Sequence, residues 1–209
     1  MTRTLFVLLP LSFLICSTAF GQEDTRRKRD RESIDSTIVI GKGRIVHQGR
    51  IYRQNAPFVT LGYGAGYGFE SKQVEQSMSF SYHHFIKNVG LQAGYLSSST
   101  TRTWWNSDQK LKELSLGGGV RKEGARYNLS AFAGPSWASG SYLYYNEANK
   151  LMVHYFSLIG LHAELLATYK IAYDIGAGFS LYGSLNSEYS VVGAQFHLYF
   201  STAFVRNYD

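Results

Sequence analysis

The chain of 209 residues carries a formal net charge of +6 at pH 7, and only 17% of its residues are charged, against roughly 25% in ordinary soluble domains. Aromatic residues are abundant (16 Tyr, 13 Phe and 3 Trp), and the single cysteine, Cys16, excludes an internal disulfide. This composition points away from an ordinary soluble domain and toward a membrane β-protein.

Residues 1–21 (MTRTLFVLLPLSFLICSTAFG) have the features of a secretory signal peptide. Arg3 supplies the positive start, an apolar core follows, and Ala19 and Gly21 place small residues at the −3 and −1 positions of a cleavage site. A transmembrane helix would need roughly 20 apolar residues, and no later segment provides them. We therefore expect export, which argues against a nucleic-acid partner and makes anionic lipid head groups or sugars the expected counter-charge.

Residues 22–55 are expected to form a charged, flexible periplasmic extension. The stretch 22–36 contains EDTRRKRDRES, in which acidic and basic side chains crowd together and Ile34 is the only apolar residue, so we interpret it as a solvated tether. Residues 37–53 alternate only in part and contain Gly41, Gly43 and Gly49, which fits a short hairpin or an ordered arm.

From Phe58 onward the sequence alternates with a period of two, which is typical of β-strands. In the last such stretch, Phe196, Leu198 and Phe200 share one face, and neither face carries a charge. One face toward lipid and the other toward a narrow lumen would explain this pattern. The eight expected strands are 58–69, 76–86, 89–97, 112–122, 126–137, 152–168, 172–184 and 189–202.

The connections between these strands alternate in length. Those at 87–88, 123–125 and 169–170 are tight, whereas those at 71–75, 100–111, 138–151 and 185–188 are longer. Outer-membrane barrels alternate in this way, with short periplasmic turns, longer outside loops and an even number of strands. We therefore predict an all-β fold, an eight-stranded antiparallel up-and-down transmembrane β-barrel over residues 56–204 with a tail at 205–209.

A soluble lipocalin-like barrel is the structural alternative. Such a barrel would carry bulky apolar residues inward and charges outward, whereas the face without bulky residues here is rich in Gly and Ser. Small side chains suit the interior of an eight-stranded barrel, which is only just wide enough for side chains.

On these residues the chain resembles the small eight-stranded outer-membrane barrels of the OmpA transmembrane-domain and OmpX kind. Gly193, Phe196 and Leu198 match part of the assembly signal in the last strand of such barrels, while Val191 stands where a polar residue is usual. The resemblance implies a bacterial outer-membrane location, with membrane lipids and the barrel-assembly machinery as partners and no cofactor.

Four polar side chains are expected to form a network in the lumen: Arg121, Glu164, His162 and Gln92. An isolated charge inside a narrow barrel is costly, so Arg121 and Glu164 should pair across the interior, joined by His162 or Gln92. We interpret this network as a structural plug, with catalysis or ion conduction as the alternatives.

Aromatic residues gather in two of the expected loops, at Trp104, Trp105, Tyr142, Tyr144 and Tyr145. They fit either an aromatic girdle at the outer leaflet or a binding surface for an extracellular glycan or protein.

Enzymatic and metal-binding roles find little support in the sequence. His154 and His162 lie roughly 25 Å apart along one strand, so they cannot share a metal ion with His197. A lipid A deacylase would need His and Ser two residues apart on a late strand, whereas His197 and Ser201 are four apart. The predicted function is a non-enzymatic structural or surface-binding (adhesion) role, with a lipid-modifying barrel enzyme or a soluble carrier as alternatives.

Overall fold

The computed structural model describes residues 37–40, 43–47, 50–86, 89–100, 110–145 and 150–207. The chain divides into two units, Met1–Ser36 and Thr37–Asp209, and all described residues belong to the second. The predictions of a signal peptide at 1–21 and a tether at 22–36, and the placement of Trp104 and Trp105, lie outside the described residues. No helix in the described part of the chain is long and apolar enough to cross a membrane.

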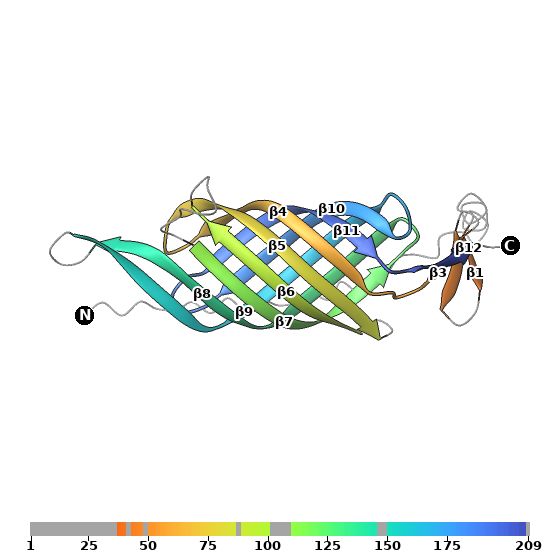
Figure 1. Cartoon of the computed structure of the whole chain (residues 1–209), viewed down its shortest axis with the longest axis horizontal. Coiled ribbons are helices and arrows are strands. Elements are labelled where there is room, and N and C mark those ends of the chain that lie inside the picture. Colours follow the sequence, from red (N-terminus) through yellow and green to blue (C-terminus); the bar gives the residue numbers. More distant parts are fainter. Residues whose placement is uncertain are drawn as a thin grey trace, which may run out of the picture. The chain divides into compact units, whose positions relative to one another are not determined.

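Eight strands close into a barrel in which each strand pairs antiparallel with its neighbours in sequence (Figure 1). The last strand closes the ring by pairing with the first, from Ser201 opposite Phe58 to Val191 opposite Gly68. The predicted all-β, up-and-down, eight-stranded antiparallel barrel is therefore confirmed. Its strands are β4 (Phe58–Gly68), β5 (Gln73–Ile86), β6 (Val89–Ser99), β7 (Lys110–Glu123), β8 (Tyr127–Tyr145), β9 (Leu151–Lys170), β10 (Ile175–Leu185) and β11 (Val191–Ser201).

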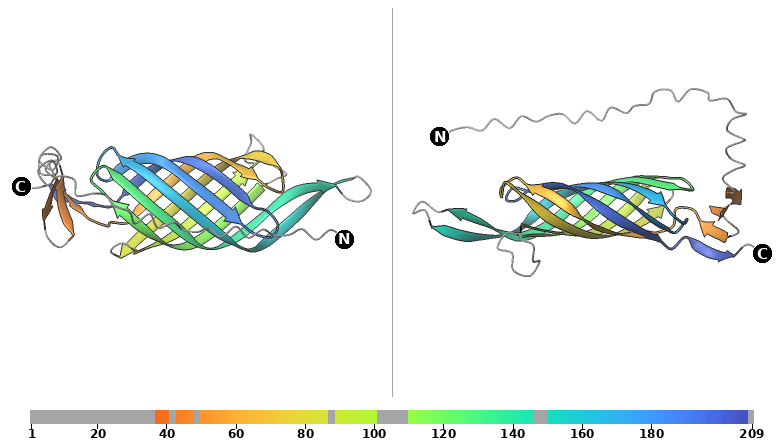
Figure 2. Two further views of the ribbon diagram at one scale, coloured as in Figure 1. Left: turned by 180° about the vertical axis from the view of Figure 1, so that it is seen from behind. Right: turned by 90° about the horizontal axis from the view of Figure 1, so that it is seen from above.

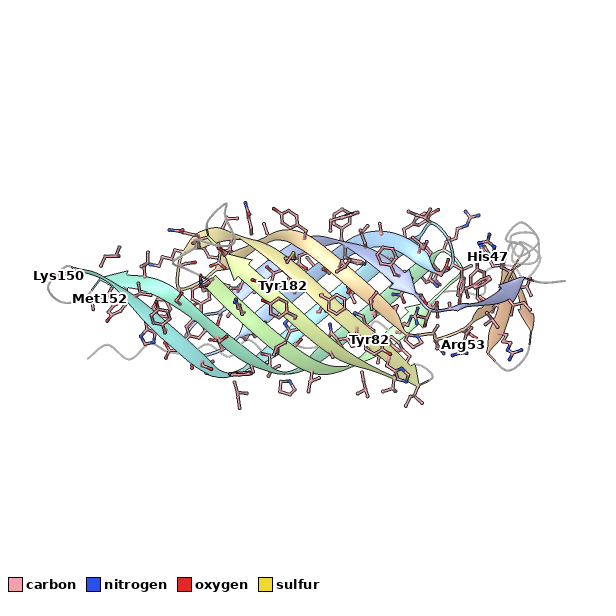
Figure 3. All side chains as sticks on the ribbon, in the orientation of Figure 1. His47, Arg53, Tyr82, Lys150, Met152 and Tyr182 are labelled. Carbon is pink, nitrogen blue, oxygen red and sulfur yellow. The ribbon has the colours of Figure 1, made fainter. Side chains whose placement is uncertain are left out.

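Side chains alternate between the outside and the inside of the barrel along every strand. Bulky apolar residues point outward, as Tyr82 does, whereas Tyr182 lies in the interior (Figure 3). The period of two in the sequence follows directly from the pleat of a strand with two different environments. The interior is not lined by Gly and Ser alone. Clusters of aromatic and aliphatic side chains also lie inside the barrel, toward both ends.

Several connections differ from their predicted positions, including those at both ends of the β8–β9 pair. The expected long loop at 138–151 is mostly strand, because β8 and β9 stay paired from Tyr127 opposite Tyr169 to Tyr145 opposite Leu151. This hairpin runs on beyond the neighbouring strands (Figure 2). At the other end, residues 169–170 belong to β9, and the turn comes after Lys170, where Ile171 N donates to Ile175 O at 2.9 Å.

A second, four-stranded sheet forms from both flanks of the barrel. Its strands are β1 (Thr37–Ile40), β2 (Arg44–His47), β3 (Arg50–Arg53) and β12 (Phe204–Asn207), in that order. The positive φ of 72° at Gly43 suits the tight turn before β2. The stretch 37–53, for which the sequence allows a hairpin or an ordered arm, thus forms three strands, and the residues after β11 add the fourth.

Candidate functional site

The lumen at the short-turn end is organised around the carboxylate of Glu123. Arg121 Nη2 lies 2.9 Å from Glu123 Oε1, and Lys170 Nζ donates to the same oxygen. The backbone N–H of Asn55 donates to Glu123 Oε2 at 3.2 Å. The Arg121 and Lys170 side chains are 1% and 0% exposed, so Glu123 balances two cations that water does not reach.

The other donors of the Arg121 guanidinium bind lumen side chains and the backbone just before β4. Its Nε donates to Asn128 Oδ1 at 2.6 Å, its Nη2 to the Tyr199 hydroxyl at 3.0 Å and its Nη1 to Ala56 O at 3.1 Å. Planar guanidinium groups also stack on aromatic faces. Its carbon Cζ lies 4.9 Å from the ring centres of Phe58 and Phe85, which close this end together with Phe132, Leu166 and Tyr199.

The predicted pairing of Arg121 with Glu164 is wrong. Gln92 Nε2 donates to Glu164 Oε2 at 2.5 Å, while Arg121 belongs to the separate group around Glu123. The reason is that β7 continues through Glu123, one residue further than predicted, so that this carboxylate shares the inward face with Arg121 and lies closer to it.

The middle of the lumen holds the second polar group. His162 Nδ1 lies 3.2 Å from Glu113 Oε2, and Glu164 and Gln92 are bonded to each other alongside. The structure therefore brings Gln92, Glu164 and His162 to one level, and it adds Glu113. The space among them, lined by Ser79, Ser81, Ser115, Tyr182 and Gln195, leaves no room for a water-sized sphere.

At the outer end of the lumen, buried side chains gather around Glu75. Its Oε2 accepts from Ser98 Oγ at 2.5 Å, and its Oε1 accepts from Ser71 Oγ at 3.0 Å and from the Tyr189 hydroxyl. Burial and the bond to Glu75 raise the pKa of Tyr189 above its ordinary value, which keeps the phenol protonated as a donor. An apolar cluster packs around this group: Leu96, Leu111, Ala138, Phe156, Tyr182, Tyr189 and Val191.

The aromatic residues predicted for surface binding lie in different environments. Tyr142 turns toward the lumen side, where its hydroxyl donates to Glu188 Oε2 at 3.3 Å and its ring lies 5.1 Å from that of His154. Tyr144 is exposed on the β8–β9 hairpin, and β8 ends at Tyr145. Of this set, only Tyr144 has a side chain that is described and open to solvent.

The three residues singled out in the last strand point out of the barrel. Phe196, Leu198 and Phe200 are 48%, 42% and 39% exposed on the wall formed by β11. At the short-turn end of the same outer surface, Tyr127 and Tyr169 stand directly opposite each other and are both exposed.

Three inward-facing charged residues are not among those predicted from the sequence, namely Glu75, Glu113 and Glu123, and Lys170 is predicted to lie in a turn. The alternation could have identified the two on β7, because Glu113, Glu123 and Arg121 are separated by even numbers of residues. Glu75 ends the predicted connection at 71–75, whereas in the structure β5 begins at Gln73.

In sequence, the chain matches no protein-family model and no curated protein. Solved structures share its fold. The attachment invasion locus protein Ail of Yersinia pestis has a TM-score of 0.50 at 12% identity, and the match covers 72% of this chain and 99% of Ail. Neisserial surface protein A has a TM-score of 0.51 at 9% identity, with 69% and 95% covered. The chain therefore has the fold of the small eight-stranded outer-membrane barrels, as its sequence resemblance indicated.

Proposed function

We propose that this chain is a non-enzymatic bacterial outer-membrane protein with a structural or surface-binding role and a plugged lumen. The observation that carries this proposal is the inverted distribution of side chains, with an apolar outer surface around a filled, polar interior. A bilayer favours this arrangement, since the outward face meets hydrocarbon. A lipocalin-like carrier needs the reverse, a ligand cavity inside and a polar surface outside.

The aromatic residues at the short-turn end support the same location. Tyr127, just after the turn into β8, and Tyr169, just before the turn that ends β9, form an exposed cross-strand pair. Tyrosine rings of this kind are enriched at the boundary between hydrocarbon and water. The expected signal peptide at 1–21 would supply export, and the assembly machinery would insert the barrel through its last strand.

Cell fractionation combined with heat-modifiable electrophoretic migration tests the membrane location. The unheated, membrane-extracted protein should migrate as a compact, detergent-resistant band that shifts on boiling. Recovery from the aqueous periplasmic fraction, without such a shift, would support the soluble carrier instead.

Inaccessible histidines support the absence of an enzymatic role. His83 Nε2 lies 3.3 Å from Thr60 Oγ1, and His197 Nε2 lies 2.9 Å from Thr168 Oγ1, which are the base–hydroxyl pairs that nucleophilic catalysis requires. Both pairs are buried in the filled lumen, where a lipid substrate cannot enter. Deacylation or acyl transfer by the purified protein on outer-membrane lipid would favour the lipid-modifying enzyme.

We infer that the β8–β9 hairpin presents the surface-binding residues. Tyr144 and Tyr155 are exposed on its two strands, and Trp104 and Trp105 belong to the preceding connection. Large aromatic side chains are frequent anchors for glycans and proteins. Replacing Tyr144 and Tyr155 by Ala should reduce adhesion of intact cells to extracellular matrix glycans, whereas replacing Tyr127 and Tyr169 should not. Unchanged adhesion in the first variant would contradict a binding role for this hairpin.

A further inference from the structure

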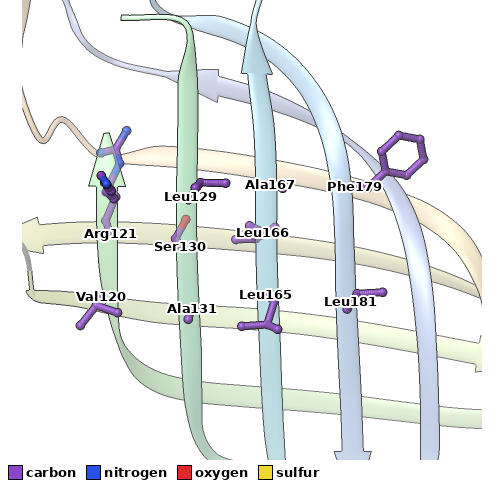
Figure 4. Close-up of a pocket in the computed structure, with 11 residues that line it drawn as sticks. Val120, Arg121, Leu129, Ser130, Ala131, Leu165, Leu166, Ala167, Phe179 and Leu181 are labelled. Atoms are coloured by element: carbon purple, nitrogen blue, oxygen red, sulfur yellow. The ribbon is translucent and has the colours of Figure 1, made fainter. Parts of the chain in front are cut away.

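A shallow hollow of about 710 Å³ lies on the outer wall of the barrel, across β7, β8, β9 and β10 (Figure 4). It arises from the register of two strands, in which Ala131 stands opposite Leu165 and Ala167 opposite Leu129. The small alanine side chain extends less far from the wall than the leucine opposite it, so each pair leaves a depression over the alanine. The two alanines thus form a floor, and the larger side chains around it are Val120, Leu129, Leu165, Phe179 and Leu181.

Two cationic residues line this apolar hollow, and only one of them faces outward, because the Arg121 side chain turns into the lumen. Lys122 belongs to its lining, is exposed, and stands in register with Leu129. Within the described part of the chain, no carboxylate forms an ion pair with Lys122; the adjacent Glu123 turns into the lumen. Arg126 adds a second exposed positive charge at the turn that follows.

The depth of the hollow fits a lipid whose head group is near Lys122. Tyr127, half of the exposed tyrosine pair at the short-turn end, lies two residues beyond Leu129, or about 7 Å along the strand. The hollow therefore begins just inside the level at which a tyrosine girdle would meet the head groups. An ammonium group at that depth reaches the interface on its four-carbon stem.

We propose that this hollow is a binding site for an anionic phospholipid, which lays an acyl chain over Ala131 and Ala167 and places its phosphate at Lys122. This inference rests on the membrane location in the proposed function. Apolar contact alone does not select one lipid within a bilayer, because every lipid offers the same hydrocarbon. Selection must come from the fit of the chain to the hollow and from the charge of the head group.

The barrel contains its own control for the role of the charge. A second outer hollow, of about 610 Å³, lies over β5 to β9 and is equally apolar. Its lining includes Phe80, Leu114, Leu116, Trp137 and Ile159 but neither Lys nor Arg. If Lys122 selects the lipid, the first hollow should prefer anionic phospholipid and the second should not.

Quenching by dibrominated lipids tests this difference in folded barrels reconstituted into phosphatidylcholine vesicles. With Trp104 and Trp105 replaced by Phe, Trp137 reports on the second hollow. Adding Trp137→Phe and Phe179→Trp moves the reporter to the first. The probes are dibrominated phosphatidylglycerol and dibrominated phosphatidylcholine at equal mole fractions.

At the first hollow we expect a relative binding constant about fivefold in favour of phosphatidylglycerol, the value typical of one cation near the membrane surface. Lys122→Gln should abolish the preference, Lys122→Arg should keep it, and Trp137 should report none. Equal quenching by both lipids at the first hollow, an equal preference at both hollows, or a preference that survives Lys122→Gln would overturn the proposal. Failure of the barrel to insert and show heat-modifiable migration would instead overturn the proposed membrane function.

Discussion

At the scale of single residues, the carboxylate of Glu123 balances the buried cations at the short-turn end of the lumen. It is the only acceptor carboxylate that the described residues provide for both Arg121 and Lys170, and it also receives the backbone N–H of Asn55. Lys170 in addition lies 3.9 Å from the ring centre of Tyr173 in the adjacent turn. One carboxylate therefore joins β7, β9 and the segment that leads into β4.

Glu123→Gln should lower the free energy of unfolding by about 3–5 kcal/mol, because it leaves two buried cations without their counter-charge. The urea midpoint of the protein refolded in lipid vesicles measures this loss.

The matched control is Glu164→Gln. Glu164 accepts from the neutral amide of Gln92, which can donate equally to an amide oxygen, so the cost should be about 1 kcal/mol or less. Adding Lys170→Met to the Glu123→Gln variant should recover part of the lost stability, because it removes one of the two cations left without a counter-charge. Equal midpoints for the two Gln variants would show that the ion pairs at Glu123 contribute no more than the single hydrogen bond at Glu164.

Two neighbouring glycines on the barrel wall should respond oppositely to an added methyl group. A Cβ on Gly134 would lie 2.1 Å from the carbonyl oxygen of Leu116, whereas a Cβ on Gly118 would meet nothing within 4 Å. Gly134→Ala should therefore cost roughly 1–3 kcal/mol through overpacking. Gly118→Ala should be neutral or stabilising by about 0.5 kcal/mol, since alanine loses less backbone freedom. Refolding titrations in urea would reveal the difference, and similar values would argue against backbone contact at Gly134.

At the scale of elements, the second sheet joins the two ends of the barrel-forming segment. β3 precedes β4, β12 follows β11, and the two short strands pair with each other. Arg53 N donates to Ala203 O at 2.7 Å where they approach the barrel. The pairing of β4 with β11, which closes the barrel, therefore continues into a second pairing, that of β3 with β12.

Truncation after Ala203, which removes β12, should expose β2 and β3 to trypsin. Arg44, Arg50 and Arg53 are cleavage sites within these strands, and pairing with β12 leaves β3 no free edge on that side. We expect faster cleavage between residues 44 and 53 in the truncated protein, while the barrel itself stays resistant. Mass spectrometry of the fragments over time measures the rate. The same rate of cleavage with and without β12 would contradict the idea that pairing with β12 protects β2 and β3.

The elements also separate what the sequence can predict from what it cannot. The wall strands β4, β5, β6 and β11 were predicted within a few residues because bulky and small side chains alternate clearly along them. The end of β8 was not, because residues 138–141 read Ala-Ser-Gly-Ser and lack the bulky outward residues that mark a strand. The β3–β12 pairing joins segments from opposite ends of the chain, and no local pattern specifies it.

Partner choice in the lumen is subject to the same limit. Alternation correctly places Arg121, His162 and Glu164 on the inward face, because that depends on strand geometry alone. Which of them pair depends on where each strand ends and on how the strands are staggered around the ring. An error of one residue at the end of β7 was enough to hide Glu123 and to misassign the partner of Arg121.

At the scale of the whole barrel, the proposed plug consists of three successive groups of side chains in the lumen. The Phe58 cluster with Arg121 lies at the short-turn end, the group around Glu113 and Glu164 lies in the middle, and the Glu75 cluster lies at the outer end. The groups lie in series along the axis. Opening any one of them would leave the other two in place.

The reconstituted protein should therefore show no stepwise conductance in planar lipid bilayers. Phe58→Ala should remain closed as well, although the cavity it creates should cost about 3–5 kcal/mol of stability. A porin incorporated under the same conditions controls for the sensitivity of the recording, and heat-modifiable migration of the recovered protein controls for folding. Discrete current steps from the unmodified barrel would contradict the plugged lumen, since ions could cross only if all three groups opened together.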